Sequence, residues 1–296
     1  MLLCLTLMRS SMASYLVTGA NGQLGQCFKA VAKSVPEVKL YFADRREVDL
    51  TQIHTLAHYF QKTPFEGIIN CAAYTAVDQA ESESEKAFAV NAQGVKNVVA
   101  FCEQHQLKLV HFSTDYVFDG TLENPYKETD LPHPISVYGR SKHEGEQQLK
   151  RANCPHTTLR ISWLFSPFEH NFVQTIRSLC QTKKEIKVVN DQWGRPTYGM
   201  DVAQIVLEQL SNPRFFEYTH YHFANQGVTT WYEWAQEICK QSTRGCTVVP
   251  CTRAAYPSRA KRPQYAVLDT TRIEKHLSLT PALWQKALER CLKRMQ

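Results

Sequence analysis

No apolar stretch in this sequence of 296 residues comes close to the roughly 20 residues that a helix needs to cross a bilayer. The sequence also lacks a Cys-x-x-Cys pair, a long basic block, an internal repeat and a low-complexity linker. The first absence excludes a membrane bundle, and the second argues against zinc-ribbon and thioredoxin-type sites. We therefore expect a globular protein with no membrane partner, no nucleic-acid partner and no bound metal.

The residues that are present are ordinary for a globular chain. Hydrophobic residues make up 43% and charged residues 21% of the sequence. Lys and Arg outnumber Asp and Glu by 34 to 28, and this surplus suits an anionic small-molecule substrate. The ten cysteines are scattered, and Cys71 lies in an apolar run where a free thiol behaves as a small hydrophobe. This cysteine usage indicates a reducing, cytoplasmic compartment.

Short apolar runs alternate with helical patterns up to residue 163. The runs predict strands at residues 14–19, 38–44, 66–74, 107–114 and 156–163, and the intervening patterns predict helices at 23–34, 53–61, 80–105 and 136–152. Strands that alternate with helices form parallel sheets through right-handed crossovers. We predict an α/β fold, namely a doubly wound parallel sheet of the Rossmann type.

A second, smaller α/β domain is expected over residues 163–296, after a first domain over residues 12–162. Prolines divide this second half into short pieces, at positions 167, 196, 213, 250, 257, 263 and 281. A helical pattern at Met200–Leu210 and a short strand at Tyr221–Ala224 can return to the first domain, so the segment near 200–225 makes the two domains partly interleaved. Residues 1–11 are expected to be a leader or a disordered tail.

Gly19, Gly22 and Gly25 lie in the stretch TGANGQLG, between a predicted strand and a predicted helix. Glycines at such a turn allow a tight bend, a close approach of backbone to pyrophosphate, and close packing of helix on strand. The backbone N–H groups at the start of the helix then face the phosphates. This pattern predicts an NAD(P)-binding domain over residues 12–162, with a plain strand-to-helix turn as the alternative.

Asp44 follows the second predicted strand, at the distance from the glycines where a carboxylate binds the adenosine ribose of NAD. Arg45 and Arg46 come directly after it and favour the 2′-phosphate of NADP, unless they form a solvated loop. We predict NADPH as the cofactor, with NADH also possible. Two further residues are expected beside the adenine, namely Asp49 and Leu50.

Tyr138 and Lys142 stand four residues apart at the start of a predicted helix, so both lie on one helix face. The preceding strand ends at Thr114, and ligands of open α/β sheets bind at the carboxyl ends of strands. Delivery of a hydride to a ketone requires a proton at the carbonyl oxygen. We expect Tyr138 to donate it, Lys142 to lower the pKa of the phenol and bind the nicotinamide ribose, and Thr114 to hold the carbonyl.

Longer motifs carry a resemblance to a known family. They are TGANGQLG (18–25), NCAAYTAVDQAE (70–81), FSTDYVFDG (112–120), VYGRSKHEGE (137–146), RISWLF (160–165) and NDQWGRPT (190–197). With these motifs the sequence resembles the extended short-chain dehydrogenase/reductase family, in its branch of 4-keto nucleotide-sugar reductases. The resemblance implies an NAD(P)H-dependent reduction of the 4-keto group of dTDP-4-dehydro-6-deoxy-L-mannose, the last step towards dTDP-L-rhamnose.

The resemblance also implies roles for individual residues. Those at the cofactor are Gln23, Leu24, Ala72, Ala73 and Tyr74, besides the glycines, Tyr138 and Lys142. Those at the dTDP-sugar are Thr75, Val77, Thr114, Asp115, Tyr116, Tyr138 and Trp163. Arg262, in a basic cluster, either meets the diphosphate or belongs to a surface loop.

Two details bear on the reaction. Tyr116 stands where related dehydratases have a glutamate, which favours reduction over loss of water. Tyr265 and Ala266 stand where the family usually has Asn and Ser, which puts the exact sugar in question. Two alternatives stay open: a non-catalytic regulatory subunit of the kind that accompanies methionine adenosyltransferase, and a reductase or epimerase of another nucleotide sugar. The protein is expected to be a cytoplasmic monomer or homodimer.

Overall fold

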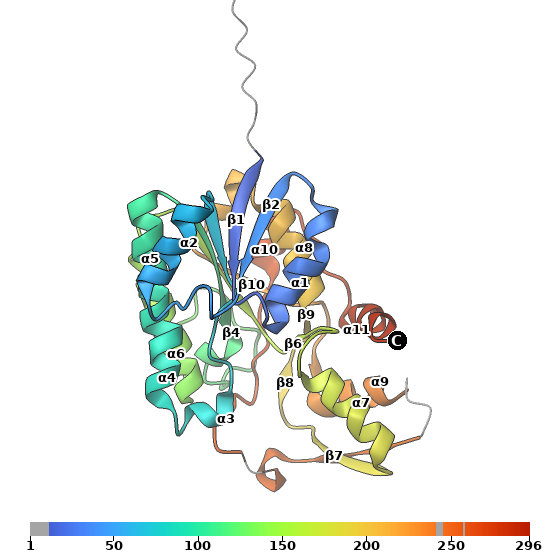
Figure 1. Ribbon diagram of the computed structural model, residues 1–296. Helices are drawn as coiled ribbons and strands as arrows, with labels where there is room; N and C mark the ends of the chain where they lie inside the picture. The colour runs from blue at the N-terminus through green and yellow to red at the C-terminus, as the bar shows by residue number, and fades with distance from the viewer. Residues whose placement is uncertain (1–11, 241–244, 257) are drawn as a thin grey trace, which may run out of the picture.

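The computed structural model describes residues 12–240, 245–256 and 258–296 (Figure 1), so the tail expected over residues 1–11 lies outside it. A six-stranded sheet with the strand order β10-β5-β4-β3-β1-β2 forms the centre. Every neighbouring pair in this sheet is parallel. The strands are β1 (Ala13–Thr18), β2 (Val38–Ala43), β3 (Gly67–Asn70), β4 (Lys108–Thr114), β5 (His156–Ile161) and β10 (His220–Phe223).

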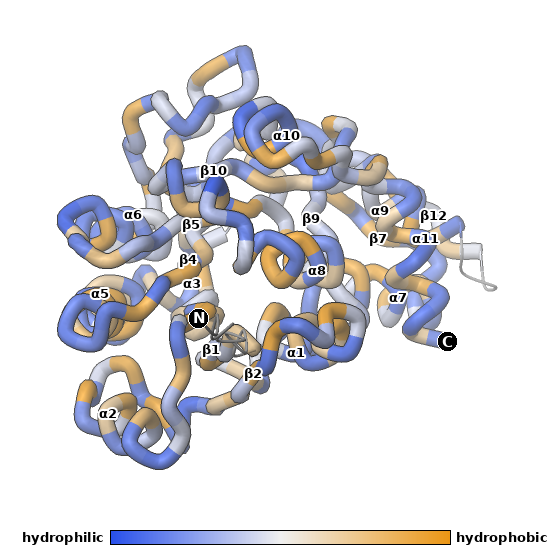
Figure 2. Tube along the Cα trace, turned by 90° about the horizontal axis from the view of Figure 1, so that it is seen from above, coloured by the Kyte–Doolittle hydropathy of each residue, from blue (hydrophilic) through white to orange (hydrophobic). Residues whose placement is uncertain are grey.

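Helices cover both faces of the sheet. Figure 2 shows α2 (Ile53–Lys62), α5 (Gly94–His105) and α6 (Val137–Lys150) on one face, and α1 (Gln23–Val31) and α8 (Gly199–Gln209) on the other. Alternate side chains of each strand enter two separate hydrophobic cores, as with Val17 in one core and Leu16 in the other. The predicted α/β class and doubly wound parallel sheet are therefore confirmed.

The order of the strands locates a crevice. From β1 the chain passes to β2 on one side and then to β3 on the other, so the winding reverses between β1 and β3. Loops leaving the carboxyl ends of two such strands diverge, and ligands of open α/β sheets bind in the gap. The gap lies between the glycine turn after Thr18 and the segment after Asn70.

A second lobe lies below the carboxyl ends of the strands in Figure 1. Its helices α7 (Phe172–Thr182) and α9 (Trp231–Lys240) pack against a parallel pair of strands, β7 (Glu185–Val189) and β12 (Thr247–Cys251). Further short pairs join β8 (Trp193–Gly194) to β11 (Thr229–Thr230) and β6 (Leu164–Phe165) to β9 (Thr197–Tyr198). Elsewhere in the described chain lie η1 (Ala32–Ser34), η3 (Asp115–Val117), η4 (Pro213–Phe216), η5 (Arg253–Ala255), α10 (Thr271–Leu277) and α11 (Trp284–Arg294).

The chain passes between the two regions more than once. After β9 it returns to the sheet, where α8 packs against α1 and β10 pairs with β5 along His220–Phe223. It then leaves again through β11 and α9. The division into domains at residue 162 stays a prediction.

The prediction of a single helix over residues 80–105 is wrong in detail. Three helical pieces precede α5, namely α3 (Val77–Ala80), α4 (Ser84–Phe88) and the π-helical turn η2 (Ala89–Gln93). The wider turn points Asn91 inward, where its amide donates to the Tyr74 carbonyl and the Ser141 hydroxyl and accepts from the Tyr74 N–H. A π-helical turn is rare and is often found at functional sites.

Two of the cysteines are joined. A disulfide between Cys180 and Cys239 links α7 to α9, and the sulfur of Cys246 lies within 4.8 Å of both. The lack of a Cys-x-x-Cys pair gave no sign of this pairing, because the two residues lie 59 positions apart. Cys71 is a free thiol, as predicted. Over the described ranges, no helix has both the length and the apolar character to span a membrane.

A buried ion pair fixes α6 to the sheet, and its loss should be costly. Glu146 of α6 accepts two hydrogen bonds from Arg160 of β5, at 2.8 and 2.7 Å, and both side chains are buried. Arg160→Met leaves a buried carboxylate without its cation, so we expect the free energy of unfolding at neutral pH to fall by roughly 3–5 kcal/mol. Urea denaturation measures this change.

The control is Arg45→Met, which removes an exposed ion pair with Asp49 and should cost less than about 1 kcal/mol. The pH dependence gives a second check. Burial alone would raise the pKa of Glu146, but Arg160 holds it well below the usual range. The contribution is therefore complete above the ordinary pKa of glutamate and is lost as the pH falls below it. Equal losses in the two variants would contradict the argument.

Candidate functional site

The glycine turn brings two backbone segments together at the β1 end. Gly19 has a φ of +63°, and a Cβ there would lie 2.7 Å from the backbone of Ala72. A Cβ at Gly25 would lie 2.5 Å from the Gly19 carbonyl oxygen. Helix α1 begins after Gly22 with no side-chain cap and no acidic residue in its first turn. Its first N–H groups therefore face outward as donors, which is the arrangement that binds phosphate.

A cavity of about 280 Å³ opens at this turn, in the gap between β1 and β3. Most residues predicted for the cofactor line it: Gly19, Gly22, Asp44, Arg45, Asp49, Leu50, Ala72, Ala73 and Tyr74. The other predicted residues do not line it, namely Gln23, Leu24, Gly25, Tyr138 and Lys142. Four lining residues were not predicted, and they are Asn21, Val48, Cys71 and Val90. Asn21 and Cys71 lie within two of the quoted motifs, whereas Val48 and Val90 lie outside them, and nothing in their residue types marked these four.

The carboxylate of Asp44 is already engaged. It accepts hydrogen bonds from the Arg46 guanidinium at 2.8 Å, from the Arg46 N–H and from the Asn21 amide. The Arg46 side chain holds the pKa of Asp44 below its usual value. Arg45 pairs with Asp49 at 3.3 Å, and both arginine side chains are largely exposed. The edge of the cavity therefore offers Arg45 and two partnered carboxylates, and Arg46 lies beside it as the partner of Asp44. This arrangement suits a ribose that carries a phosphate.

Tyr138 is held by the start of α6. The Ser136 side chain caps the helix by accepting from the Gly139 N–H, and the Glu81 carboxylate accepts from the Val137 N–H. A Cβ at Gly139 would collide with the Tyr116 carbonyl oxygen, so glycine allows this helix end to touch the segment after β4. The Tyr138 ring consequently meets the Tyr116 ring edge to face, with 5.7 Å between centroids.

The phenol of Tyr138 is a protonated group at neutral pH. Burial raises its pKa, although a hydrogen bond with the Thr114 side chain acts in the opposite direction. This shift is opposite to the lowering expected from Lys142. The hydroxyl of Thr114 itself donates to the Asp115 carboxylate at 3.0 Å. The structure therefore brings together Thr114 and Tyr138, two of the three residues predicted to be catalytic.

Lys142 points to β4 instead of Tyr138. Its ammonium nitrogen donates to the Phe112 carbonyl at 2.7 Å and lies 3.5 Å from the His111 imidazole. Among the described residues it forms no hydrogen bond with Tyr138. Burial lowers the pKa of Lys142 to about 8. The third predicted catalytic residue thus lies one helical turn below the phenol, on the same face of α6.

Asp115 is buried with one unsatisfied atom. Its Oδ1 accepts from Thr114, whereas its Oδ2 has no partner within the described parts of the chain. Burial raises the pKa of Asp115 to about 7. A buried carboxyl oxygen without a partner is costly and calls for a ligand donor. This observation fits a hydroxyl-bearing substrate at the carboxyl end of β4.

The other residues predicted for the substrate surround this point in part. Arg262 binds the Asp78 carboxylate at 2.6 Å and contacts the Tyr116 phenol, so it belongs to the site region and not to a free loop. Trp163 has a φ of +48° and stacks on Trp231 of α9, with 3.8 Å between ring centroids. The exposed Thr75 lies on the loop before α3, and the half-buried Val77 is the first residue of α3.

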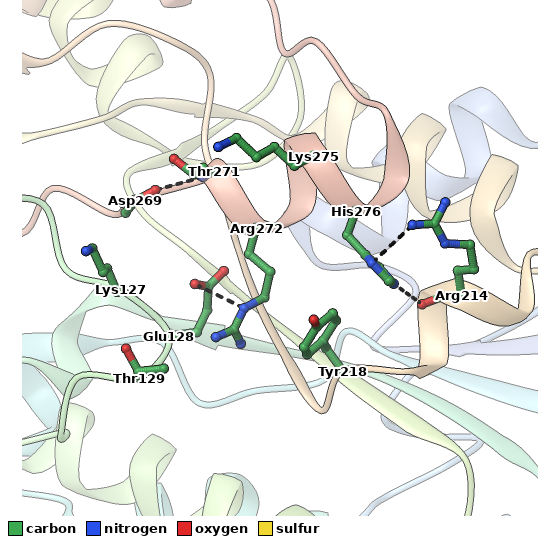
Figure 3. Close-up of a pocket in the computed structure, with 10 residues that line it drawn as sticks. All are labelled: Lys127, Glu128, Thr129, Arg214, Tyr218, Asp269, Thr271, Arg272, Lys275 and His276. Atoms are coloured by element: carbon green, nitrogen blue, oxygen red, sulfur yellow. Dashed lines mark hydrogen bonds and ion pairs between the residues drawn. The ribbon is translucent and has the colours of Figure 1, made fainter.

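A larger cavity lies elsewhere, beside the edge strand β10. It has a volume of about 590 Å³ and is shown in Figure 3. Arg272 lies 3.6 Å from the Glu128 carboxylate there, and His276 contacts Arg214. None of the residues predicted from the sequence lines it. We therefore place the candidate cofactor site at the smaller cavity between β1 and β3, which most of the residues predicted for the cofactor line.

Comparisons with known proteins agree with this geometry. The model of the RmlD substrate binding domain matches residues 13–296. The chain belongs to that family. A relative in it is the dTDP-4-dehydrorhamnose reductase of Aggregatibacter actinomycetemcomitans, which is 37% identical over 287 residues, or 94% of this chain and 98% of the relative.

Two further relatives of the chain show the range of the family. The dTDP-4-keto-6-deoxy-D-glucose reductase of Streptomyces niveus is 34% identical over 86% of this chain and 88% of its own. The crystal structure of dTDP-4-dehydrorhamnose reductase from Bacillus anthracis in complex with NADP has a TM-score of 0.90 and 34% identity, over 95% of this chain and 99% of its own. The resemblance inferred from the motifs is therefore confirmed.

The glycine turn should tolerate an added methyl group at one position and not at another. Gly25→Ala forces a Cβ against the backbone of Gly19 and Ala20, so we expect the free energy of unfolding to fall by about 1–3 kcal/mol. Gly22→Ala places its Cβ 3.3 Å from one carbonyl oxygen at an ordinary φ of −74°, and should cost less than about 1 kcal/mol. Urea unfolding of both proteins compares them. Similar losses would mean that the close approach at Gly25 is not a constraint.

Proposed function

We propose that this chain reduces the 4-keto group of dTDP-4-dehydro-6-deoxy-L-mannose with NADPH, giving dTDP-L-rhamnose. The observation that carries the proposal is the meeting of a protonated Tyr138 phenol with Thr114 at the carboxyl end of β4, in a sheet whose glycine turn lines a cavity at the carboxyl end of β1. The family and the names of its members support this substrate and an oxidoreductase activity. The retained catalytic residues argue against a purely regulatory subunit.

The cofactor fits the residues present. The uncapped start of α1 and the close approach of Gly19 to Ala72 suit a pyrophosphate, and Arg45 and Arg46 suit a 2′-phosphate. The relative from Bacillus anthracis binds NADP. When bound, NADPH supplies the hydride. NADH stays possible because Asp44 lies at the same edge of the cavity.

Tyr138 acts as the acid in this proposal. Negative charge develops on the carbonyl oxygen as the hydride arrives, and a proton donor at that oxygen stabilises it. Burial keeps the phenol protonated near neutral pH, so the donor is ready before reaction. Thr114 orients the carbonyl oxygen. Lys142, one helical turn along α6 from Tyr138, binds the nicotinamide ribose.

The sugar nucleotide would lie between the sheet and the second lobe, which we propose as the substrate-binding domain over residues 163–296. Support comes from the unsatisfied oxygen of Asp115, the Tyr116 ring, the stacked Trp163 and the cation of Arg262. Aromatic faces and a guanidinium suit a base and a diphosphate. We further propose a cytoplasmic enzyme that works as a monomer or homodimer.

A second candidate substrate differs in stereochemistry only. The relative from Streptomyces niveus is named for a D-glucose-derived 4-keto sugar. In this chain the backbone N–H of Ala266 donates to the Trp193 carbonyl at 2.9 Å. Tyr265 and Ala266 lack the amide and the hydroxyl of the usual Asn and Ser, and this departure makes a different sugar the second candidate. NMR analysis of the product made from each 4-keto substrate separates the two reactions.

Removal of the Tyr138 hydroxyl tests the proposed acid. Tyr138→Phe should lower kcat about 10²- to 10⁴-fold, because no other group donates the proton. The loss of NADPH absorbance with the 4-keto substrate, generated in place, measures the rate. Tyr41→Phe, a half-buried tyrosine of β2, is the control and should keep full activity. Full turnover of Tyr138→Phe would reject the assignment, and inactivity of the unaltered enzyme with both cofactors would favour another sugar or a regulatory role.

The two arginines test the cofactor. Replacing Arg45 and Arg46 by Ala together should raise the Kd of NADPH about tenfold, since each loses a charge-assisted contact to the 2′-phosphate. The Kd of NADH should change little, because that cofactor has no 2′-phosphate. Fluorescence titration of both cofactors measures the two constants. An equal change for NADPH and NADH would show that the arginines form only a solvated loop.

A further inference from the structure

A chain of buried polar side chains connects the glycine turn to Lys142. Its members come from four neighbouring elements: Thr18 of β1, Asn70 of β3, His111 of β4 and Lys142 of α6. Each is almost inaccessible, with exposed fractions of 0%, 1%, 1% and 3%. Polar groups this deeply buried must match donors with acceptors, because a mismatch costs more than the hydrogen bond gains.

The amide of Asn70 has a fixed orientation. The Ala72 backbone N–H can only donate, and it lies 3.2 Å from the amide atom Oδ1. The Thr18 hydroxyl donates to the same oxygen at 2.8 Å. The amide oxygen therefore faces these two donors, and the amide nitrogen faces the Nδ1 atom of His111 at 3.1 Å.

This orientation decides where His111 carries its proton. Since the amide nitrogen of Asn70 donates, Nδ1 of His111 must accept. Burial lowers the pKa of His111 well below its usual value, so the ring is neutral and its one proton lies on Nε2. That N–H points to the Lys142 nitrogen at 3.5 Å. The neutral amine of Lys142 has a lone pair that can accept from this N–H, whereas its ammonium form has only donors and faces the N–H unfavourably.

We propose that His111 is a positioning residue that favours the neutral amine of Lys142, and thereby sets the pH range in which the ammonium form is available to the reaction. The proposal rests on the proposed function, in which Lys142 belongs to the catalytic site. The Phe112 carbonyl accepts from either form of the lysine, so it anchors Lys142 without choosing between them.

Other charged groups near Lys142 also affect the equilibrium between its amine and its ammonium form. Glu146 lies one turn along α6 and favours the ammonium, although Arg160 of β5 already pairs with it. Cys71, beyond β3, acts in the same direction as Glu146. Around His111, after burial itself, the charge of Lys142 acts against a second proton on the ring and that of Glu146 favours it. His220 of β10 and His156 of β5 add smaller effects against the second proton. Burial and His111 therefore favour the neutral amine of Lys142, whereas Glu146 favours the ammonium.

The proton position on His111 can be measured without activity. Long-range ¹H–¹⁵N correlation spectra of protein labelled at its 11 histidines separate rings protonated at Nε2 from rings protonated at Nδ1. The His111 signal is identified by its loss in His111→Gln. We expect a neutral ring protonated at Nε2 from acidic to alkaline pH. A ring protonated at Nδ1, or doubly protonated near neutral pH, would overturn the proposal while leaving the proposed function intact.

A pair of substitutions tests the effect on Lys142. An Asn side chain can replace the acceptor at Nδ1 but not the donor at Nε2, whereas a Gln side chain can replace the donor. In His111→Asn the alkaline limb of the kcat–pH profile should move to higher pH by about one unit, because Lys142 then keeps its ammonium form up to a higher pH. In His111→Gln the limb should stay within a few tenths of a unit of the unaltered enzyme.

The matched control is His156→Asn, a buried histidine of β5 whose ring bonds the Cys154 carbonyl. It should lose stability without moving the limb, which separates a packing effect from an effect on Lys142. The proposal would be overturned if the alkaline limb of the kcat–pH profile lay at the same pH in His111→Asn and His111→Gln. It would also be overturned if that limb moved to lower pH in His111→Asn. If His111→Asn does not fold, the proton position in the unaltered protein decides alone. Failure of the proposed function would instead be seen in Tyr138→Phe.

Discussion

The close packing of α6 on the chain around it is the constraint on which the site depends. Two glycines make it possible, because a Cβ at Gly139 would meet the Tyr116 carbonyl and a Cβ at Gly145 would meet the Asn91 carbonyl. With backbone touching backbone on both sides, the helix cannot slide along its axis. Tyr138 at its first turn is therefore aligned with the end of β4. A site built on rigid elements holds its geometry more accurately than one built on loops.

Much of this arrangement could be predicted because the signals are local in the sequence. The glycine turn and the Tyr138–Lys142 spacing each occupy a few residues, and the alternation of strands and helices fixes which ends of the strands meet. The breaks in the helix expected over residues 80–105 could not be predicted from the sequence. That stretch holds no proline and one glycine, Gly94, and a single glycine is tolerated within a helix. The π-helical turn there is stabilised by contacts of Asn91 with Tyr74 and Ser141, which are distant in sequence.

The expectations about charge were less successful than those about position. Lys142 was expected to lower the pKa of Tyr138, but its nitrogen lies against Phe112 and burial raises the pKa of the phenol. Asn70 and His111 were missed, although Asn70 ends the apolar run of β3 and His111 interrupts the apolar run of β4, and those polar residues were the available signal. A single sequence shows that such a residue is buried, but its partner on the next strand depends on register.

The return of the chain to the sheet has a consequence for how the molecule is held together. Because β10 pairs with β5 and the helix α8 packs on α1, residues that follow the first part of the second lobe complete the sheet and its helical cover. A fragment that ended near residue 162 would leave β5 as an open sheet edge, with unpaired N–H and C=O groups and an uncovered apolar face. The six-stranded sheet and its helical cover are therefore complete only when the chain up to β10 is in place.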